Sequence, residues 1–363
     1  MYLITNRVLK NRRGLGAFGK EPNPKGPNEL RLVEVNKNGR SWGVEVINDD
    51  LSKDEVVELK NQFNLDIDEN KSWHASLGVA CRLFDRAREE NKAILFFVHG
   101  YNNDVEDVLK TAFELEKLYN VIAVPFTWPA NGGGVISGTA SYLSDKADAR
   151  ASTDALNRFV EKIQFFHLLL TEAALAEVRG KVEEKYPQKS NPDAAQALYG
   201  RLVDEMCTVK LNLLCHSMGN YLLKYSLNTS ENSTSNAVFD NICLVAADTN
   251  NKQHARWVEK LDPRNRLYIV INEDDSALKA SRIKPGKEQL ARLGHYLKGL
   301  NSENANYVDV TEADEVGSEH SYFKGKSVKD NPKLKEVFKF MFNGKTVEHL
   351  LDYVHGNNSY QLK

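Results

Sequence analysis

One serine in this sequence stands where it could act as a nucleophile. Ser217 lies in the stretch LLCHSMGNY, residues 213–221, after an apolar run and before a helical pattern. A serine on a sharp turn between strand and helix projects its hydroxyl out of the sheet, and the small Gly219 lets the two elements approach. The backbone N–H of Met218 would then face negative charge developing beside the serine. The pattern predicts a nucleophile elbow, with Cys215 at the position of the usual first glycine.

A second turn offers another backbone N–H donor that could face the same developing charge as Met218. The residues HGYN, 99–102, directly follow the apolar run 93–98. A turn of this type after a central strand can direct the N–H of Tyr101 into the site of the serine. We therefore expect Tyr101 and Met218 to form an oxyanion hole, with His99 and Gly100 shaping the turn. The alternative is an ordinary glycine turn that contains a hydrogen-bonded histidine.

The serine needs a base, and the chain offers one in the expected order. In sheets that carry such an elbow, the acid and then the histidine follow the serine along the chain. His320 comes after the predicted strand 306–310 and before a helix near residue 332, so we predict it as the base. His295 precedes that strand and is expected to be structural. His216 is adjacent to the serine and points away from it, which indicates a packing or supporting role.

Three aspartates are candidates for the residue that orients the base. Asp274 and Asp275 follow the apolar run 267–271, and Asp248 follows the run 241–247. Placement after the penultimate strand favours the pair, of which we choose Asp275. A surface carboxylate doublet that caps the next helix is the alternative, and Asp275 would be a suitable N-cap in either case.

The elements that position these residues form a repeating pattern. Short runs rich in Val, Ile, Leu and Phe, without strict alternation, are typical of strands buried on both faces. They alternate with amphipathic helices such as 104–119, which predicts βαβ crossovers and a mostly parallel sheet flanked by helices. Residues 29–47 add an N-terminal antiparallel hairpin that turns at Asn38 and Gly39. Ligands bind beyond the carboxyl ends of such strands, where the candidate residues stand. The predicted runs are 93–98, 121–126, 209–214, 241–247 and 267–271.

The domain prediction is a single unit, residues 1–363, with a helical insertion at 129–206. The insertion is a possible lid, and an elaborated crossover is the alternative. Its apolar side chains would suit a lipase or phospholipase, but helical spacing also suits packing into a core. They are Phe159, Ile163, Phe165, Phe166 and Leu168 to Leu170.

The composition limits the kinds of partner and cofactor that we expect the protein to bind. The 363 residues carry 48 Lys and Arg against 50 Asp and Glu, so no broad charge favours nucleic acid. The four cysteines show no regular spacing, and the histidines lack the H-E-x-x-H pattern, so neither a metal nor a cofactor is expected. Glycine-rich stretches, including NGGG at 131–134, are not followed by G-K-[ST]. With no signal peptide or apolar stretch of about 18 residues, we expect a cytoplasmic protein.

With these residues in hand, the chain resembles the α/β-hydrolase superfamily, and most closely its bacterial DUF900 group. The matching stretches run from about residue 94 to 323. The resemblance implies Ser217 as nucleophile, His320 as base and Asp275 as acid, with the Tyr101 and Met218 amides as oxyanion donors. Glu319 replaces an expected glycine, as does Cys215. The stretches are FFVHGYN, FTWPANG, LLCHSMGNYLL, NEDDSALKASR with RLG, and VDVT…EHSYF, with an echo in LITNR.

These observations predict a serine hydrolase that cleaves a carboxylic ester or related small acyl compound through an acyl-enzyme. Two alternatives stay open. One is a lipase or phospholipase whose lid is the helical insertion and whose substrate is a lipid or membrane surface. The other is a catalytically silent hydrolase fold that serves as a binding or regulatory protein. The sequence does not specify the physiological substrate or the oligomeric state.

Overall fold

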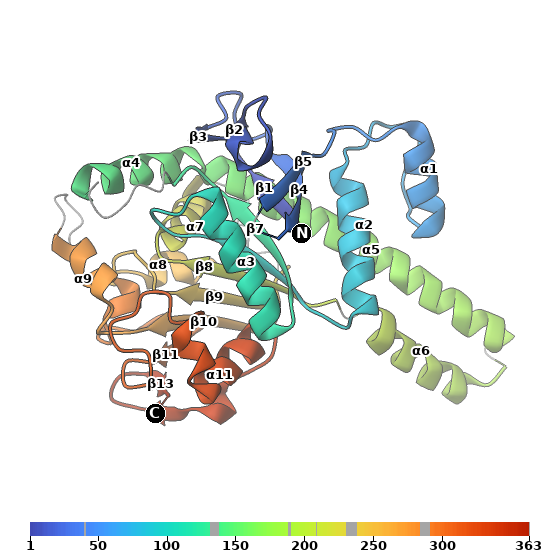
Figure 1. Ribbon diagram of the computed structural model, residues 1–363. Coiled ribbons are helices and arrows are strands. Elements are labelled where there is room, and N and C mark those ends of the chain that lie inside the picture. Colours follow the sequence, from blue (N-terminus) through green and yellow to red (C-terminus); the bar gives the residue numbers. More distant parts are fainter. Residues whose placement is uncertain are drawn as a thin grey trace. The chain divides into compact units, whose positions relative to one another are not determined.

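The computed structural model describes residues 1–39, 41–130, 138–187, 190–207, 209–229, 238–283 and 291–362 (Figure 1). It contains two compact units. The larger unit comprises Met1–Val46, Ala93–Val160 and Leu211–Lys363, and the smaller comprises Ile47–Lys92 and Glu161–Lys210. All candidate site residues belong to the larger unit.

A large sheet forms the centre of the larger unit. Over the described residues it has eleven strands, in the order β12-β13-β11-β10-β9-β8-β6-β7-β1-β4-β5. The six central strands are parallel, and almost all of their residues are buried, as their unbroken apolar runs predicted. The predicted α/β fold is therefore confirmed. These strands are β6 (Ile94–Val98), β7 (Ile122–Thr127), β8 (Leu211–His216), β9 (Asn241–Val245), β10 (Arg266–Ile271) and β11 (Ala305–Asp309).

The sheet is extended at both edges by short strands. The predicted hairpin is present as β4 (Arg31–Asn38) and β5 (Ser41–Val46), which pair antiparallel. Strand β1 (Tyr2–Thr5) lies between β4 and β7 and was not predicted, because four residues are too few to show a period. The other short strands are β2 (Arg7–Leu9) and β3 (Phe18–Pro22), which form a separate two-stranded sheet, and β12 (Asp352–Val354) and β13 (Ser359–Gln361) at the far edge.

Strands β6 and β8 are neighbours at the point where the chain changes direction across the sheet. From β6 the chain crosses to β7 on one side, whereas from β8 it proceeds to β9, β10 and β11 on the other. Crossover connections leave in opposite directions here, so a crevice opens beyond the carboxyl ends of these two strands. Both predicted turns, 99–102 and 216–219, begin at this place.

Helices cover both faces of the sheet (Figure 1). On one face, α3 and α11 lie side by side over a core that contains Leu95 and Phe97 of β6. On the other face, Phe96 packs edge-on against Phe159 of α5, and α4 packs on α7. The helices of the larger unit are α3 (Val105–Tyr119), α4 (Gly138–Ala151), the first turns of α5 (Thr153–Lys185), α7 (Met218–Thr229), α8 (Ala255–Val258), α9 (Ser276–Ile283), α10 (Lys326–Lys329) and α11 (Pro332–Phe342); short 3₁₀ turns are η1 (Gly14–Ala17), η3 (Leu293–His295) and η4 (Glu348–Leu350).

The smaller unit is helical. It contains α1 (Lys53–Gln62), α2 (Ser76–Glu89), most of α5 and α6 (Pro192–Met206). Helix α1 begins with a capping box in which Ser52 and Glu55 exchange hydrogen bonds. In this unit the Trp73 ring stacks on Phe165, with centroids 6.2 Å apart.

The predicted insertion 129–206 does not coincide with either unit. Helix α4 and the start of α5 belong to the larger unit, and the rest belongs to the smaller. Its residues 131–137, with the NGGG stretch, lie outside the described residues. Of its apolar side chains, Phe165 and Leu168 are exposed, whereas Phe159, Ile163, Phe166 and Leu170 are buried. The role of the insertion as a lid stays a prediction.

Gly294 tests how tightly the backbone is packed beyond the carboxyl ends of β9 and β10. The Gly294 N–H donates to Ala247 O at 3.0 Å, and its carbonyl accepts from Asn272 N at 3.1 Å. A methyl group added there would lie 2.2 Å from Ala247 N, and backbone cannot move aside as a side chain can. We expect Gly294→Ala to lower the free energy of unfolding by about 3 kcal/mol, measured by urea denaturation. Gly16→Ala, which would contact only Arg12 at 3.8 Å, is the control, and equal midpoints for the two variants would contradict the prediction.

Candidate active site

Ser217 occupies a strained turn between β8 and α7. Its φ of +52° lies in the left-handed region, which residues other than glycine rarely adopt. The turn is held on the sheet because Ser217 N donates to Val245 O at 3.0 Å. A methyl group at Gly219 would lie 2.6 Å from Val98 O, so only glycine lets α7 come this close to β6. This is the strand–turn–helix geometry of a nucleophile elbow.

Asn220, which sequence reasoning missed, braces the elbow. Its buried side-chain amide donates to the carbonyls of Cys215, Ser217 and Val245 at 3.0, 3.1 and 3.2 Å. These carbonyls belong to the end of β8, to the turn and to the adjacent strand β9, so one amide ties all three together. The position directly after the motif glycine, at the first turn of a buried helix, is the signal that could have found it.

The glycine turn after β6 lies directly against the serine. A methyl group added at Gly100 would be 2.7 Å from Ser217 Cβ and 3.2 Å from Ser217 Oγ. The backbone of the 99–102 turn and the serine side chain are therefore in contact, as the neighbouring positions of β6 and β8 require. Met218 is the first residue of α7, where a backbone N–H has no acceptor within the helix.

His320 and Asp275 form a direct pair. His320 Nδ1 lies 2.6 Å from Asp275 Oδ2, and the Asp275 side chain is fully buried. The other carboxylate oxygen, Oδ1, accepts from Leu278 N at 2.9 Å, so Asp275 also caps α9. Asp274, by contrast, is exposed. Of the two consecutive aspartates, the structure brings Asp275 to the histidine.

The loop that carries His320 is fastened to the turn that carries Asp275. The Asn272 side-chain amide donates to Gly317 O at 2.9 Å and Glu319 O at 3.2 Å. Ser276 adds two bonds to Ser318 O, from its N–H at 3.2 Å and its hydroxyl at 3.1 Å. Asn272 and Ser276 flank the aspartate in sequence, but only the fold reveals that they hold the histidine loop.

His216 connects the elbow to the histidine loop. Its Nε2–H donates to His320 O at 3.1 Å, and the centroids of the two imidazole rings are 4.7 Å apart. Its ring also contacts Phe323, with centroids 4.9 Å apart. The residue next to Ser217 in sequence therefore supports the loop that presents His320. In the described part of the chain, no hydrogen bond joins Ser217 Oγ to His320.

Asp248, the alternative acid, is occupied elsewhere. It forms a buried ion pair with Arg292, with Oδ1 and Nε 3.0 Å apart. Its carboxylate also accepts from Ser281 Oγ at 2.6 Å and Tyr142 Oη at 2.9 Å. The Tyr142 ring, on α4, lies against Tyr101 with centroids 5.6 Å apart. Asp248 thus joins α4 and α9 to the end of β9.

Tyr142 and Arg292 were not singled out from the sequence. Arg292 belongs to the RLG stretch, which served only as a family match, and Tyr142 lies in the insertion without a pattern of its own. His295, expected to be structural, is 6% exposed, and neither of its ring nitrogens has a hydrogen-bond partner. The structure does not join His295 to Ser217.

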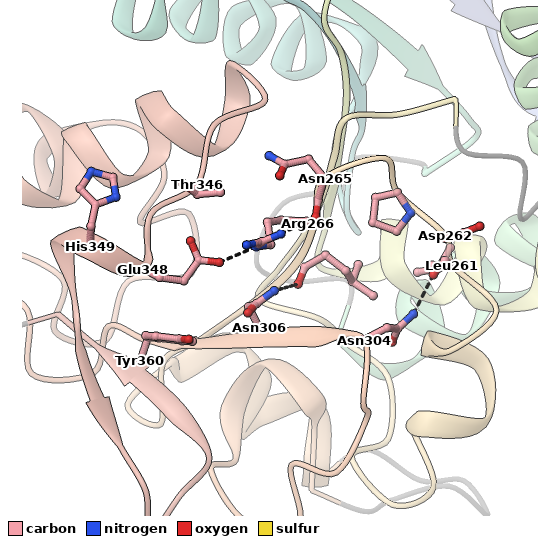
Figure 2. Close-up of a pocket in the computed structure, with 12 residues that line it drawn as sticks. Leu261, Asp262, Asn265, Arg266, Asn304, Asn306, Thr346, Glu348, His349 and Tyr360 are labelled. Atoms are coloured by element: carbon pink, nitrogen blue, oxygen red, sulfur yellow. Dashed lines mark hydrogen bonds and ion pairs between the residues drawn. The ribbon is translucent and has the colours of Figure 1, made fainter.

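A pocket of about 610 Å³ lies at the other end of the sheet (Figure 2). It opens at the amino ends of β10 and β11, whereas Ser217 follows the carboxyl end of β8. Figure 2 shows Arg266 paired with Glu348 across it, at 2.6 Å. The side-chain amide of Asn304 donates to the carbonyl of Leu261, another residue of the lining, at 2.7 Å. The Asn306 amide likewise donates to a backbone carbonyl, Leu267 O at 3.5 Å, and none of the candidate catalytic residues lines the pocket.

The comparisons with known proteins agree with the observed fold. The family model described as alpha/beta hydrolase of unknown function (DUF900) matches residues 81–166 and 161–334. The chain therefore belongs to the DUF900 family of α/β hydrolases. Neither a curated protein nor a solved structure matches it.

Two further properties concern the described residues as a whole. No group of three or more His, Cys, Asp or Glu side chains among them is arranged to hold a metal ion. None of the helices within them combines the length and the apolar character that crossing a bilayer requires.

The buried His216 makes stability depend on pH. Burial, together with the neighbouring His320, lowers the pKa of His216 well below that of histidine in water, about 6.5. Below that pH the unfolded chain binds a proton that the folded chain does not, so the free energy of unfolding falls as the pH falls. Glutamine can keep the bond to His320 O without titrating. We expect His216→Gln to reduce the stability loss between pH 7 and pH 5 by about 2 kcal/mol, measured by urea denaturation.

The exposed His355 provides the control, since His355→Gln also removes one imidazole. An unchanged pH dependence in His216→Gln would contradict the expected uptake of a proton on unfolding.

Proposed function

We propose that this α/β hydrolase is a serine hydrolase that cleaves a carboxylic ester or a related small acyl compound. In this proposal Ser217 is the nucleophile, His320 the general base and Asp275 the residue that orients the base. Tyr101 and Met218 supply the backbone N–H groups of the oxyanion hole. The lipase and the silent binding protein remain the alternatives to be separated by experiment.

The observation that carries the proposal is the contact of 2.6 Å between His320 Nδ1 and the fully buried carboxylate of Asp275. A carboxylate at Nδ1 fixes the proton on that nitrogen and leaves Nε2 with a lone pair, which is what a general base requires. The same carboxylate stabilises the imidazolium that forms when the base accepts a proton. The 23% exposure of the His320 side chain is compatible with a ring edge facing a substrate.

The reaction would proceed in two halves. Ser217 Oγ attacks the acyl carbon as His320 Nε2 accepts the hydroxyl proton, which places negative charge on the carbonyl oxygen. The tetrahedral intermediate collapses, the alcohol leaves with the proton from His320, and the acyl group stays on the serine. Water then attacks the acyl-enzyme by the same route, and the carboxylic acid is released.

Two features of the elbow support this role for the serine. The left-handed backbone at Ser217 requires surrounding structure to hold it, and such strain tends to gather at functional sites. The contact of Gly100 with the serine brings the 99–102 turn beside the reacting hydroxyl. Donors on the Tyr101 and Met218 amides would lie on two sides of the oxyanion, each worth about 3–4 kcal/mol.

Removal of the nucleophile gives the most direct test. We expect Ser217→Ala to lower kcat for a short acyl ester by about 10⁴–10⁶, because acyl transfer loses its covalent route. A fluorophosphonate probe, read by intact mass, should add once to the wild type and not to folded Ser217→Ala. A wild type that takes up no probe would favour the silent binding protein. Turnover that rises as substrate passes from monomer to micelle would favour the lipase.

The two consecutive aspartates form a matched pair. We expect Asp275→Asn to lower kcat by about 10⁴, because an amide at Nδ1 favours the wrong tautomer of His320. Asp274→Asn alters an exposed carboxylate one residue away and should leave kcat within about twofold. Steady-state kinetics on folded variants provide the measurement. Equal losses in both variants would overturn the role of Asp275.

A further inference from the structure

We propose that Arg7, acting through Thr127 and His99, positions the peptide group whose N–H is the Tyr101 oxyanion donor. The inference rests on the proposed function and adds residues that the catalytic assignment does not include. Arg7 comes from β2, Thr127 from the end of β7 and His99 from the turn after β6. Three separate segments would therefore orient one hydrogen-bond donor.

We call the series of side chains Arg7, Thr127 and His99 the relay, and it begins with the buried guanidinium of Arg7. Arg7 is 3% exposed, and its Nε donates to Thr127 Oγ1 at 3.2 Å. Its other nitrogens donate to Gly19 O at 3.3 Å, Ala130 O at 3.2 Å and Asn103 O at 3.5 Å. These acceptors are all neutral oxygens, and they lie in the segments that surround the glycine turn. A buried arginine that holds backbone carbonyls in this way acts as a rigid clamp, since its donors form a fixed planar fork.

Thr127 and Trp128 then decide which nitrogen of His99 carries the proton. Trp128 N donates to His99 Nε2 at 3.2 Å, and Thr127 Oγ1 lies 3.2 Å from the same nitrogen. A backbone N–H can only donate, so Nε2 is an acceptor and the neutral ring carries its proton on Nδ1. Because Arg7 uses the hydroxyl oxygen as acceptor, Thr127 is left to direct its own proton at Nε2. Burial, reinforced by the charge of Arg7, lowers the pKa of His99 to about 3, which keeps the ring neutral.

The His99 ring, with its proton fixed on Nδ1, in turn holds the backbone of the 99–102 turn. Its Nδ1–H donates to Gly100 O at 2.9 Å, and the Asn103 side-chain amide donates to the same oxygen at 3.3 Å. Gly100 O and Tyr101 N–H belong to one planar trans peptide group and point in opposite directions. Two donors on the carbonyl therefore fix the direction of the N–H, away from the His99 ring. The same glycine contacts Ser217, so a rotation of this peptide would be felt at the nucleophile.

The closing experiment compares matched variants at Thr127. We expect Thr127→Val to lower kcat about tenfold with KM unchanged within twofold, because a misdirected oxyanion donor weakens the transition state alone. Thr127→Ser keeps the hydroxyl and should restore most of the loss. Arg7→Met should behave as Thr127→Val does. Thr111→Val, which alters a buried threonine of α3 outside the relay, controls for general destabilisation.

A second readout observes the peptide without any substrate. Gly100–Tyr101 is the sole Gly–Tyr pair in the sequence, so ¹³C-carbonyl glycine with ¹⁵N-tyrosine labels this peptide alone. We expect its NMR signal to shift in Thr127→Val and Arg7→Met, and to stay at the wild-type position in Thr111→Val. Labelled His99 should show the Nδ1–H tautomer throughout pH 5–9.

The two readouts separate failure of the relay from failure of the proposed function. If the wild type hydrolyses esters and both folded relay variants keep the wild-type kcat and peptide signal, the relay is overturned while the hydrolase stands. If the wild type neither hydrolyses esters nor reacts with the phosphonate, the catalytic role of the relay falls with the proposed function. An unshifted signal in that case would overturn the structural role as well.

Discussion

The close approach of two backbones at the centre of the sheet is the constraint on which the rest of the site depends. Gly100, after β6, lies against Ser217, after β8, and a single methyl group at the glycine would come within 2.7 Å of the serine Cβ. Gly219 makes a similar contact with Val98 O. Because β6 and β8 are adjacent where the crossovers diverge, both turns are forced into one small space. Larger residues at these positions would push apart Ser217 and the proposed oxyanion donors.

Two buried carboxylates and two buried imidazoles near this contact are paired, and the pairing gives each of them a different task. Asp275 faces His320, whereas Asp248 is neutralised by Arg292 and ties together α4, α9 and β9. His99 bonds backbone on both ring nitrogens, and His216 supports the loop of His320. Because burial without a partner costs free energy, each of these pairs fixes the segment that carries it. The polar shell therefore also provides the rigidity of the site.

Much of the fold could be predicted because its signals are local. The buried runs of β6 to β10 and the amphipathic helix α3 follow from residue type and period, and the elbow follows from Ser217 and Gly219 between a strand and a helix. The strand β1 and the C-terminal strands were missed, since segments of three or four residues show no period. The brace at Asn220 and the fastening of the histidine loop by Asn272 were also missed, because an asparagine in a turn gives no indication of which distant carbonyls it will meet.

The sequence by itself therefore determined the order of the elements and the kinds of chemical group at the strand ends: a serine, aspartates and a histidine in the order that a hydrolase of this family would need. The tertiary structure decided which of them meet. Asp275 rather than Asp274 reaches His320 because it is the buried residue at the start of α9. Arg7 reaches Thr127 because β1 pairs with β7, which brings together Thr5 and Thr127, 122 positions apart in the chain. Such contacts depend on the lateral order of the strands and on burial, which no local pattern encodes.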